Sequence, residues 1–386
     1  MARRSSTQIS TVDITFGVEE EFFLVNPETR DLEPDPDVRI FEEAEENSGA
    51  HTIVPEFLRA QIESNTKVCH SMEEVKASII ETRRNIIEAA GRYGTAVIAA
   101  STHPSAEWKR QLPTRKHRYE SFALRYQDAI RQLMISGMHV HAGFTHADQR
   151  VRVMTRLREY LPLLQALSSS SPYYDGRETG FKSFRLCLYG LLPRTGIPPA
   201  LNSWEDWRGV VENFQRIEAK SDGGELWWDI RPSEKFPTIE MRVCDTCPNI
   251  DDVMAICVLY GCLILKFVNE DNPWLPIDHA PAELIQQNRW LAQRYGILAF
   301  LGRLREGGKI DVYDQAEELV KELTPYAETK GWMEHLNHVM TIIRFGSSAD
   351  RQVDQYHLAI SQNASHEEAI ASVVALLINE TKQQVV

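Results

Sequence analysis

The sequence predicts an α+β fold, in which helices pack on a largely antiparallel sheet and the C-terminal third is helical. Strand-like and helix-like segments are mixed between residues 15 and 268. Two strand-like segments, residues 226–232 and 237–245, are separated by a single turn, as in an antiparallel hairpin. From His279 onward, apolar residues recur mostly at helical spacing, which predicts the helical C-terminal third.

The expected elements follow from the spacing of apolar residues and from the residues that interrupt it. Residues 15–25 form an apolar strand closed by a turn-like segment at 26–29, and residues 71–93 form a helix that Gly94 ends. A helix over residues 365–381 opens with Ser365 and Glu368 at capping-box spacing. The same criteria predict strands at 95–99 and 137–144, and helices at 118–133, 147–167, 204–219, 251–268, 281–295, 314–323 and 329–345.

The composition is that of a globular protein: of 386 residues, 43% are hydrophobic and 25% charged. The net charge of -13 argues against a nucleic-acid-binding surface. No segment approaches the roughly 20 apolar residues of a membrane span, and no signal-peptide-like run follows the N-terminus. We therefore expect a cytoplasmic protein without a membrane partner, with a disordered tail at residues 1–12 and a single domain over residues 13–386.

Three consecutive glutamates interrupt the first strand, in the segment TFGVEEEFFLV. Alternate residues of a strand share a face, so Glu19 and Glu21 project together, while Glu20 points to the other face, toward solvent or a basic partner. A solvated strand face often carries glutamate. The surrounding Phe, Leu and Val residues instead indicate a covered sheet, where neighbouring carboxylates repel each other unless a cation lies between them. A divalent metal ion would meet that need.

A second acidic pair, Glu56 and Glu63, lies in the segment PEFLRAQIESNTKVC. If residues 60–68 form a strand, Glu63 shares a face with Gln61. Glu56 is seven residues before Glu63, so the two side chains converge only if the chain bends near residues 57–58. Taken alone, each glutamate is more typical of a surface residue than of a metal ligand.

Two further strands carry polar side chains on one face. In GMHVHAGF, His139 and His141 share a face, which is a recurrent arrangement in metal and phosphate sites. One such histidine is readily explained as a satisfied core residue, and two are less easily explained in that way. In TIEMRVCD, Glu240 and Arg242 share a face, either as an ion pair or as a metal ligand beside a phosphate-binding guanidinium.

The segment WWDIRPS repeats this acid–base pattern with Asp229 and Arg231. Together these strands predict a sheet with one metal- and phosphate-binding face, because oxygen-rich ligands with a few imidazoles suit magnesium or manganese. The residues that we expect on that face are Glu19, Glu21, Glu63, His139, His141, Glu240 and Arg242. The sequence contains neither a Walker-type GxxxxGK[ST] loop nor a GxGxxG motif after a strand. Any phosphate handling must then use the sheet itself.

Cys244 and Cys247 form a CxxC pair that requires a separate interpretation. A zinc or redox site is one reading of such a pair. A second CxxC is missing, and no helix pattern begins at Cys244. Buried, inert thiols are therefore the better interpretation.

Taken in order, these motifs are similar to the successive signatures of the type-2 glutamate–cysteine ligase family, the small bacterial carboxylate–amine ligases. The motifs are GVEEEFFLV, PEFLRAQIESNTKVC, STHP, GMHVHAGF, WWDIRPS and TIEMRVCDTCP, and they span residues 16–265. The resemblance implies a glutamine-synthetase-like sheet and a homo-oligomer. It also implies that ATP, with magnesium or manganese, activates a glutamate-like carboxylate as an acyl-phosphate, which an amine such as cysteine attacks to form an amide.

The resemblance also implies a set of metal ligands drawn from several strands. By the position of each motif, these are Glu19, Glu21, Glu56, Glu63, His139 and Glu240. One departure from the family pattern is Glu20, because that position is often apolar in the family. Three glutamates therefore stand where two are needed.

The remaining site residues are expected to act on the substrates. By resemblance, His141 joins the nucleotide site, and Arg242 contacts the transferring phosphoryl group, with Glu240 beside it as the second catalytic residue. Arg231 and Arg185 correspond to candidates for binding a substrate carboxylate or phosphate. The sequence around them does not identify the amino acid that is bound.

Two other functions fit part of the pattern. A guanidino-kinase-like phosphotransferase shares the same sheet architecture, but the acidic segments GVEEE and PEFLRAQIE favour the ligase. A non-catalytic nucleotide- or metal-binding protein is the other alternative. The presence of all the acidic residues and of Arg242 argues against that alternative.

Overall fold

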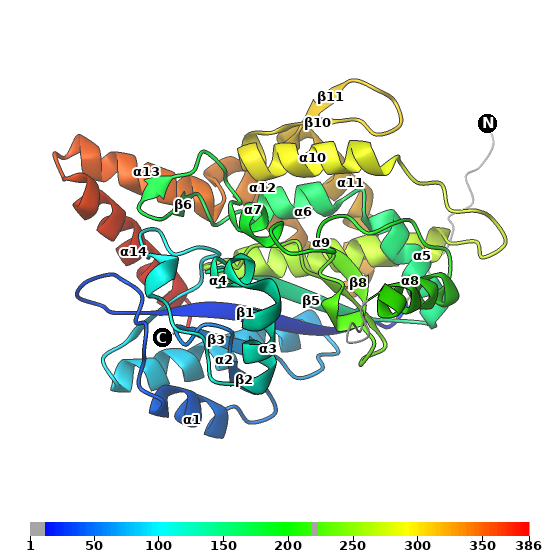
Figure 1. Ribbon diagram of the computed structural model, residues 1–386. Helices are drawn as coiled ribbons and strands as arrows, with labels where there is room; N and C mark the ends of the chain where they lie inside the picture. Colours follow the sequence, from blue (N-terminus) through cyan, green and yellow to red (C-terminus); the bar gives the residue numbers. More distant parts are fainter. Residues whose placement is uncertain (1–11, 218–222, 386) are drawn as a thin grey trace.

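The centre of the molecule is one antiparallel sheet of seven strands, in the order β2-β3-β1-β5-β9-β8 with β4 paired to the end of β1. The computed structural model describes residues 12–217 and 223–385. Figure 1 shows β1 running through the middle of the molecule. The strands of this sheet are β1 (Thr15–Val25), β2 (Thr52–Pro55), β3 (Gln61–Asn65), β4 (Ala96–Ile98), β5 (Met138–Gly143), β8 (Ile230–Pro232) and β9 (Thr238–Met241).

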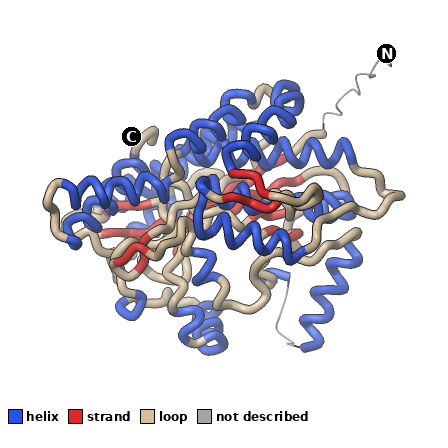
Figure 2. Tube along the Cα trace, turned by 90° about the horizontal axis from the view of Figure 1, so that it is seen from above, coloured by secondary structure: helices blue, strands red, loops and turns tan. Residues whose placement is uncertain are grey.

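Helices cover one face of this sheet. Helix α2 (Met72–Arg92) packs on β1, β3 and β4, α5 (Ala147–Leu157) packs on β8 and β9, and α9 (Ile250–Glu270) lies against both helices. In Figure 2 the strands lie in the middle of the molecule with helices around them. The other helices are α1 (Arg39–Glu46), α3 (His117–Tyr126), α4 (Asp128–Arg131), α6 (Leu161–Ser168), α7 (Arg185–Tyr189), α8 (Trp204–Ile217), α10 (Ala282–Tyr295), α11 (Val312–Lys330), α12 (Met333–Phe345), α13 (Ser348–Ser361) and α14 (His366–Lys382).

Smaller elements complete the chain. Two short hairpins pair β6 (Tyr173–Tyr174) with β7 (Arg177–Glu178), and β10 (Phe300–Gly302) with β11 (Lys309–Asp311). Single 3₁₀ turns span Trp108–Arg110, Gly223–Glu225 and Gly296–Leu298. None of the helices in the described part of the chain is both long and apolar enough to span a membrane.

The two faces of β1 differ in exposure, which explains the sequence of this strand. Val18, Glu20 and Phe22 are buried on the face that the helices cover, whereas Glu19 and Glu21 are partly exposed on the other. The alternation confirms that the middle glutamate points away from its two neighbours. The second half of the strand, residues 22–25, is buried on both faces and is apolar throughout.

Several expected helices were wrong in their bounds, each for a local reason. The expected helix at 118–133 is broken at Gln127, whose φ is 48°, into α3 and α4. The helix expected at 147–167 is interrupted after Leu157, and α6 begins at Leu161 with Pro162 in its first turn, where proline is tolerated. Helix α11 continues through Pro325 to Lys330 and ends at left-handed Gly331, so α12 starts only at Met333 rather than at Thr329.

Other expectations were confirmed or lie outside the described residues. The capping box of Ser365 and Glu368 is formed at the start of α14. Helices α1, α7 and α13 were not expected from the sequence. The expected tail at residues 1–12 lies outside the described residues except for Val12, and the expected helix at 204–219 is described to Ile217.

Candidate functional site

The register of the sheet gathers the expected polar side chains on the face opposite α2 and α9. Glu21 of β1 pairs with Glu63 of β3, and Glu19 pairs with His139 of β5. His141 of β5 pairs with Glu240 of β9. Because directly paired residues of antiparallel strands point to the same side, these side chains form a row across the sheet.

One end of this row is a cluster of three carboxylates, Glu21, Glu56 and Glu63. Each offers an oxygen atom within 4.8 Å of the others, a separation that one metal ion can bridge. Glu56 joins because β2 ends at Pro55 and the chain turns before β3 starts at Gln61, which is the bend that the spacing required. The hydrogen bonds in this cluster come from neutral groups: the Gly137 amide donates to Glu21 at 2.7 Å, and Asn65 donates to Glu63 at 2.6 Å.

In this cluster burial and carboxylate repulsion outweigh the nearby positive charges of Arg185 and Arg242. Burial, followed by repulsion from Glu56, raises the pKa of Glu21 to about 8. Burial together with the charges of Glu19, Glu56 and Glu21 raises the pKa of Glu63 well above its ordinary value. Carboxylates with raised pKa values held this close together fit a cation, whose charge would favour their ionised forms.

A second cluster follows along the row, formed by Glu19, His141 and Glu240, whose ligand atoms also lie within 4.8 Å of one another. His141 Nε2 lies 3.1 Å from Glu19 Oε1, and its Nδ1 lies 3.0 Å from the Thr238 hydroxyl. His139 Nδ1 lies 2.9 Å from Glu19 Oε2, and His139 is only 4% exposed. Both histidines therefore contact Glu19, and His139 Nδ1 also lies 3.9 Å from Glu240 Oε1.

The two histidines hold Glu19 in its ionised form. Burial alone would raise the pKa of Glu19, but hydrogen bonds with His139 and His141 hold that pKa well below its ordinary range. Burial and the nearby Arg242 lower the pKa of His139 to about 4, so its imidazole is neutral near pH 7. For His141, burial is outweighed by the hydrogen bond to Glu19 and by the charges of Glu240 and Glu19, which raise its pKa, so a cation bound there would displace a proton from this imidazole.

Two arginines flank Glu240. Arg231 Nε donates to Glu240 Oε2 at 2.8 Å, and Arg242 Nη1 donates to Glu240 Oε1. Arg242 also donates to the hydroxyl of Tyr189 at 3.0 Å, while its Nε is buried without a hydrogen-bond partner among the described residues. The side chains of Arg231 and Arg242 are 13% and 12% exposed, so both reach the edge of the site. Two guanidinium groups share one carboxylate, which leaves a net positive charge for an anionic group.

Arg185 lies beside Gly137 and the backbone of Arg242 and is not part of the row of side chains. It is 2% exposed, and its terminal nitrogens donate to the Arg242 carbonyl at 3.3 Å. A Cβ atom at Gly137 would lie 2.3 Å from Arg185 Nη2, so glycine is needed where β5 approaches. The positive charge of Arg185 partly opposes the raised pKa of Glu21.

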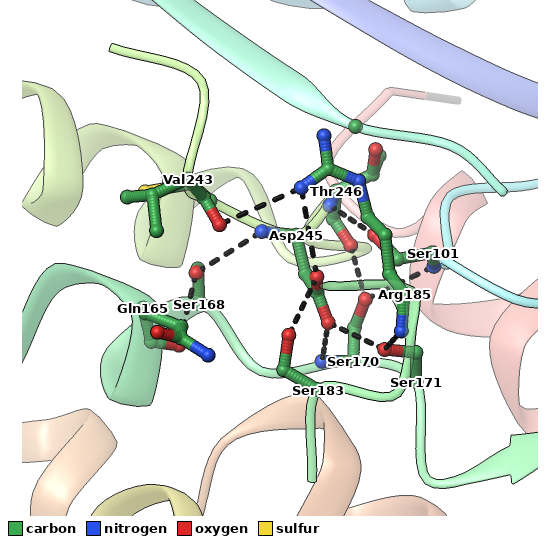
Figure 3. Close-up of polar contacts among 12 residues, drawn as sticks. Ser101, Gln165, Ser168, Ser170, Ser171, Ser183, Arg185, Val243, Asp245 and Thr246 are labelled. Atoms are coloured by element: carbon green, nitrogen blue, oxygen red, sulfur yellow. Dashed lines mark hydrogen bonds and ion pairs between the residues drawn. The ribbon is translucent and has the colours of Figure 1, made fainter. Parts of the chain in front are cut away.

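A buried polar network supports Arg185 and the segment after β9 (Figure 3). Asp245 accepts hydrogen bonds from Ser171 at 2.7 Å and Ser183 at 3.0 Å, and lies 4.0 Å from Arg185. The Thr246 amide donates to Ser101 in the same region. The serine-rich segment at residues 168–171 thus belongs to the support of the site.

Sequence reasoning missed several of these residues. Thr238 lies two residues before Glu240 on the same strand, so the period of two could have identified it. Tyr189 lies outside the strands of the row, and Asp245 lies beyond Met241, where β9 ends short of the expected strand at 237–245, so strand periodicity identifies neither. Cys244 and Cys247 are buried free thiols, and burial raises the pKa of Cys244 to about 12, which agrees with the inert reading.

Comparison with known sequences identifies a family. The model of "Glutamate-cysteine ligase family 2" matches residues 15–375. A protein of Rhodospirillum rubrum, provisionally named glutamate–cysteine ligase 2, is 38% identical over 375 residues, covering 95% of each chain. A protein of the same provisional name from Jannaschia sp. is 36% identical, covering 95% of this chain and 96% of its own. The resemblance in the motifs is thereby confirmed.

Two solved structures share the fold. Glutamate–cysteine ligase of Francisella tularensis, in complex with AMP, has a TM-score of 0.67 at 14% identity, covering 98% of this chain and 94% of that one. A bifunctional glutathione synthetase of Pasteurella multocida has a TM-score of 0.68 at 16% identity, covering 96% of this chain and 53% of that one. At these identities the likeness concerns the fold, and it confirms the expected α+β, glutamine-synthetase-like architecture.

Proposed function

This chain belongs to glutamate–cysteine ligase family 2, and from that membership we propose that it is an ATP- and magnesium-dependent carboxylate–amine ligase. Its substrates would be a glutamate-like carboxylate and an amine such as cysteine. One observation supports this most directly: two acidic clusters lie side by side on one face of the sheet, with Arg231 and Arg242 at the Glu240 end.

The acidic clusters fit magnesium or manganese. Glu21, Glu56 and Glu63 supply only carboxylate oxygens, and Glu19 and Glu240 add carboxylates beside His141. Oxygen-rich sites of this kind suit hard divalent cations that also bind nucleotide phosphates. Bound metal would neutralise phosphate charge during transfer of the phosphoryl group. We assign His139 to holding Glu19 in place, because its Nδ1 contacts that carboxylate.

The arginines would act on the transferring group. In the proposed reaction an oxygen of the substrate γ-carboxylate attacks the γ-phosphorus of ATP, and ADP leaves. The amine nitrogen then attacks the acyl carbon, phosphate leaves, and the nitrogen loses a proton, so that an amide forms. Arg242 would stabilise the negative charge that spreads over the phosphoryl oxygens, and Arg231 would orient a phosphate or carboxylate beside it. Arg185 would act through the backbone of Gly137 and Arg242.

The identity of the amine and the assembly of the protein are parts of the same proposal. Cysteine is the acceptor that the family name suggests, and a panel of amines tests it against alternatives. We also propose a homo-oligomer, which a light-scattering mass would test. The family match favours the ligase over a guanidino kinase.

The test is release of ADP with ATP, magnesium and glutamate, each amine being added in turn. We expect ADP release that depends on both glutamate and one amine. Glu19→Gln and Arg242→Ala should abolish it without unfolding the protein, because one removes a metal ligand and the other removes charge stabilisation worth about 10²–10³ in rate. The exposed Glu45→Gln on α1 is the matched control and should keep full activity. Unchanged ADP release in either site variant would refute the site.

A further inference from the structure

A fully buried ion pair lies directly behind the acidic row. Glu20, between Glu19 and Glu21 on β1, points to the helix-covered face, where it meets Arg83 of α2. Arg83 Nη2 lies 2.5 Å from Glu20 Oε1, and Arg83 Nε lies 3.1 Å from Glu20 Oε2. The two side chains are 0% and 1% exposed, respectively, so water screens neither charge.

Arg83 also has a structural task that does not involve Glu20. Its Nη1 donates to the Pro248 carbonyl at 2.6 Å, and its Nη2 donates to the Cys247 carbonyl at 2.8 Å. These carbonyls lie in the turn between β9 and α9, whose Asn249 caps α9. The arginine thus satisfies buried carbonyls at the start of α9, which would otherwise be costly to leave unpaired.

That task places a positive charge inside the protein, behind a strand whose other face carries Glu19 and Glu21. An uncompensated guanidinium there would repel a metal ion bound to those carboxylates and lower the metal affinity. Because the guanidinium is buried, water would screen this repulsion only weakly. Glu20 is the group that neutralises it. The register of β1 does not need the pair, because β1 is hydrogen-bonded to β3 and β5 along both edges.

We propose that Glu20 is a positioning residue whose buried charge cancels that of Arg83 and so preserves the cation affinity of the acidic row on the opposite face. This inference rests on the proposed function, because it takes that row to be a metal site. A purely structural ion pair would stabilise the fold without affecting metal affinity. The two roles therefore differ in a binding measurement.

The experiment measures Mn²⁺ binding to the intact chain without substrates, by the electron paramagnetic resonance signal of free Mn²⁺. Glu20→Gln leaves Arg83 uncompensated, and we expect the dissociation constant to rise on the order of a hundredfold, as for one unit charge about 10 Å from a divalent ion at an effective dielectric constant near 20. Arg83→Met removes the positive charge and should not weaken binding. The double variant Glu20→Met/Arg83→Met should return the constant to within about threefold of wild type.

A matched control separates charge from stability. Arg152 and Asp271 form another buried pair, with side chains 8% and 3% exposed, in which Arg152 Nε lies 2.9 Å from Asp271 Oδ1. Arg152 also donates to the carbonyls of Asn272 and Leu275, as Arg83 does to its own two. Asp271→Asn should lower the Tm as Glu20→Gln does and leave Mn²⁺ affinity unchanged.

Each outcome decides the question. Wild-type affinity in a folded Glu20→Gln variant, or a double variant as weak as Glu20→Gln, would overturn the proposal. If Glu20→Gln does not fold, weaker Mn²⁺ binding by Arg83→Met or by the double variant would also overturn the proposal. Absence of Mn²⁺ binding in the wild type would instead refute the metal site itself, and the inference with it.

Discussion

At the scale of single residues, the site is defined by carboxylates whose pKa values are shifted from that of a free glutamate side chain. Glu21 and Glu63 have raised pKa values because they are buried near other carboxylates, while histidines hold Glu19 ionised. Glu19 and Glu21, two residues apart on the same face of β1, thus differ in the direction of their pKa shifts, because His139 pairs with Glu19 and Glu63 pairs with Glu21. This contrast explains why the Glu21 end of the row should respond most strongly to a cation.

The raised pKa of Glu21 predicts how stability depends on pH. Between its ordinary value of 4.5 and about 8, the folded chain holds a proton at Glu21 that the unfolded chain has lost. The stability that this group contributes is therefore present below about pH 4.5 and is lost as pH rises through about 8. Without metal, urea unfolding should show this decline, and Glu21→Gln should flatten it.

Magnesium should oppose the same decline, because the ion binds the deprotonated carboxylates and stabilises the folded state by mass action. At a concentration of about one hundred times the dissociation constant, the gain would be about 2.7 kcal/mol. Urea unfolding curves at about pH 8, with magnesium or with a chelator, measure this gain. In the presence of a chelator, the free energy of unfolding should depend on pH differently in the wild type and in Glu21→Gln. The same pH dependence in both proteins would contradict the assignment of Glu21.

At the scale of elements, the strand carrying the histidines depends on a glycine at its entrance. Gly137 lies immediately before β5, donates its amide to Glu21 and leaves room for the guanidinium of Arg185. The sequence indicates Gly137 only as a flanking residue of GMHVHAGF. Its close approach to α7 is a tertiary contact, which strand periodicity does not encode.

Gly137→Ala tests this contact. The new Cβ atom would lie 2.3 Å from Arg185 Nη2, so the arginine or β5 must shift. We expect a loss of about 1–3 kcal/mol in the free energy of unfolding. We also expect lower ADP release, because Glu21 accepts a hydrogen bond from Gly137 and the Arg242 carbonyl accepts one from Arg185. Gly91→Ala in α2 is the control: nothing lies within 4 Å of its Cβ, and it should stabilise by about 0.5–1 kcal/mol. Unaltered activity and stability in Gly137→Ala would show that the contact between Gly137 and Arg185 does not require glycine.

The elements also show what the sequence predicts well. Period-two patterns identified the face of β1, β5 and β9, because side-chain direction in a strand is fixed by the backbone. Helix bounds were less predictable: Pro162 restarts a helix, Gln127 breaks one through a positive φ, and Gly331 ends one. Pro162 and Gly331 are local signals for a helix boundary, whereas the sequence around Gln127 carries none.

At the scale of the whole molecule, the site depends on an order of strands that differs from their order in the chain. Glu63, Glu21 and His139 become neighbours because β1 lies between β3 and β5. The sequence could predict which residues share a face of each strand. It could not predict the strand order, the entry of Glu56 from the turn after β2, or the support from Asp245, since these follow from packing between distant segments.

The proposed reaction has a consequence that involves the whole catalytic face. If the γ-carboxylate of the substrate is activated as an acyl-phosphate, one of its oxygens leaves with the phosphate. Glutamate labelled with ¹⁸O in the γ-carboxylate, incubated with ATP, magnesium and the amine that supports ADP release, allows a direct measurement by mass spectrometry. The account predicts one ¹⁸O atom in the phosphate for each amide formed. Amide formation with unlabelled phosphate, or labelled glutamate left unchanged while ADP accumulates, would contradict it.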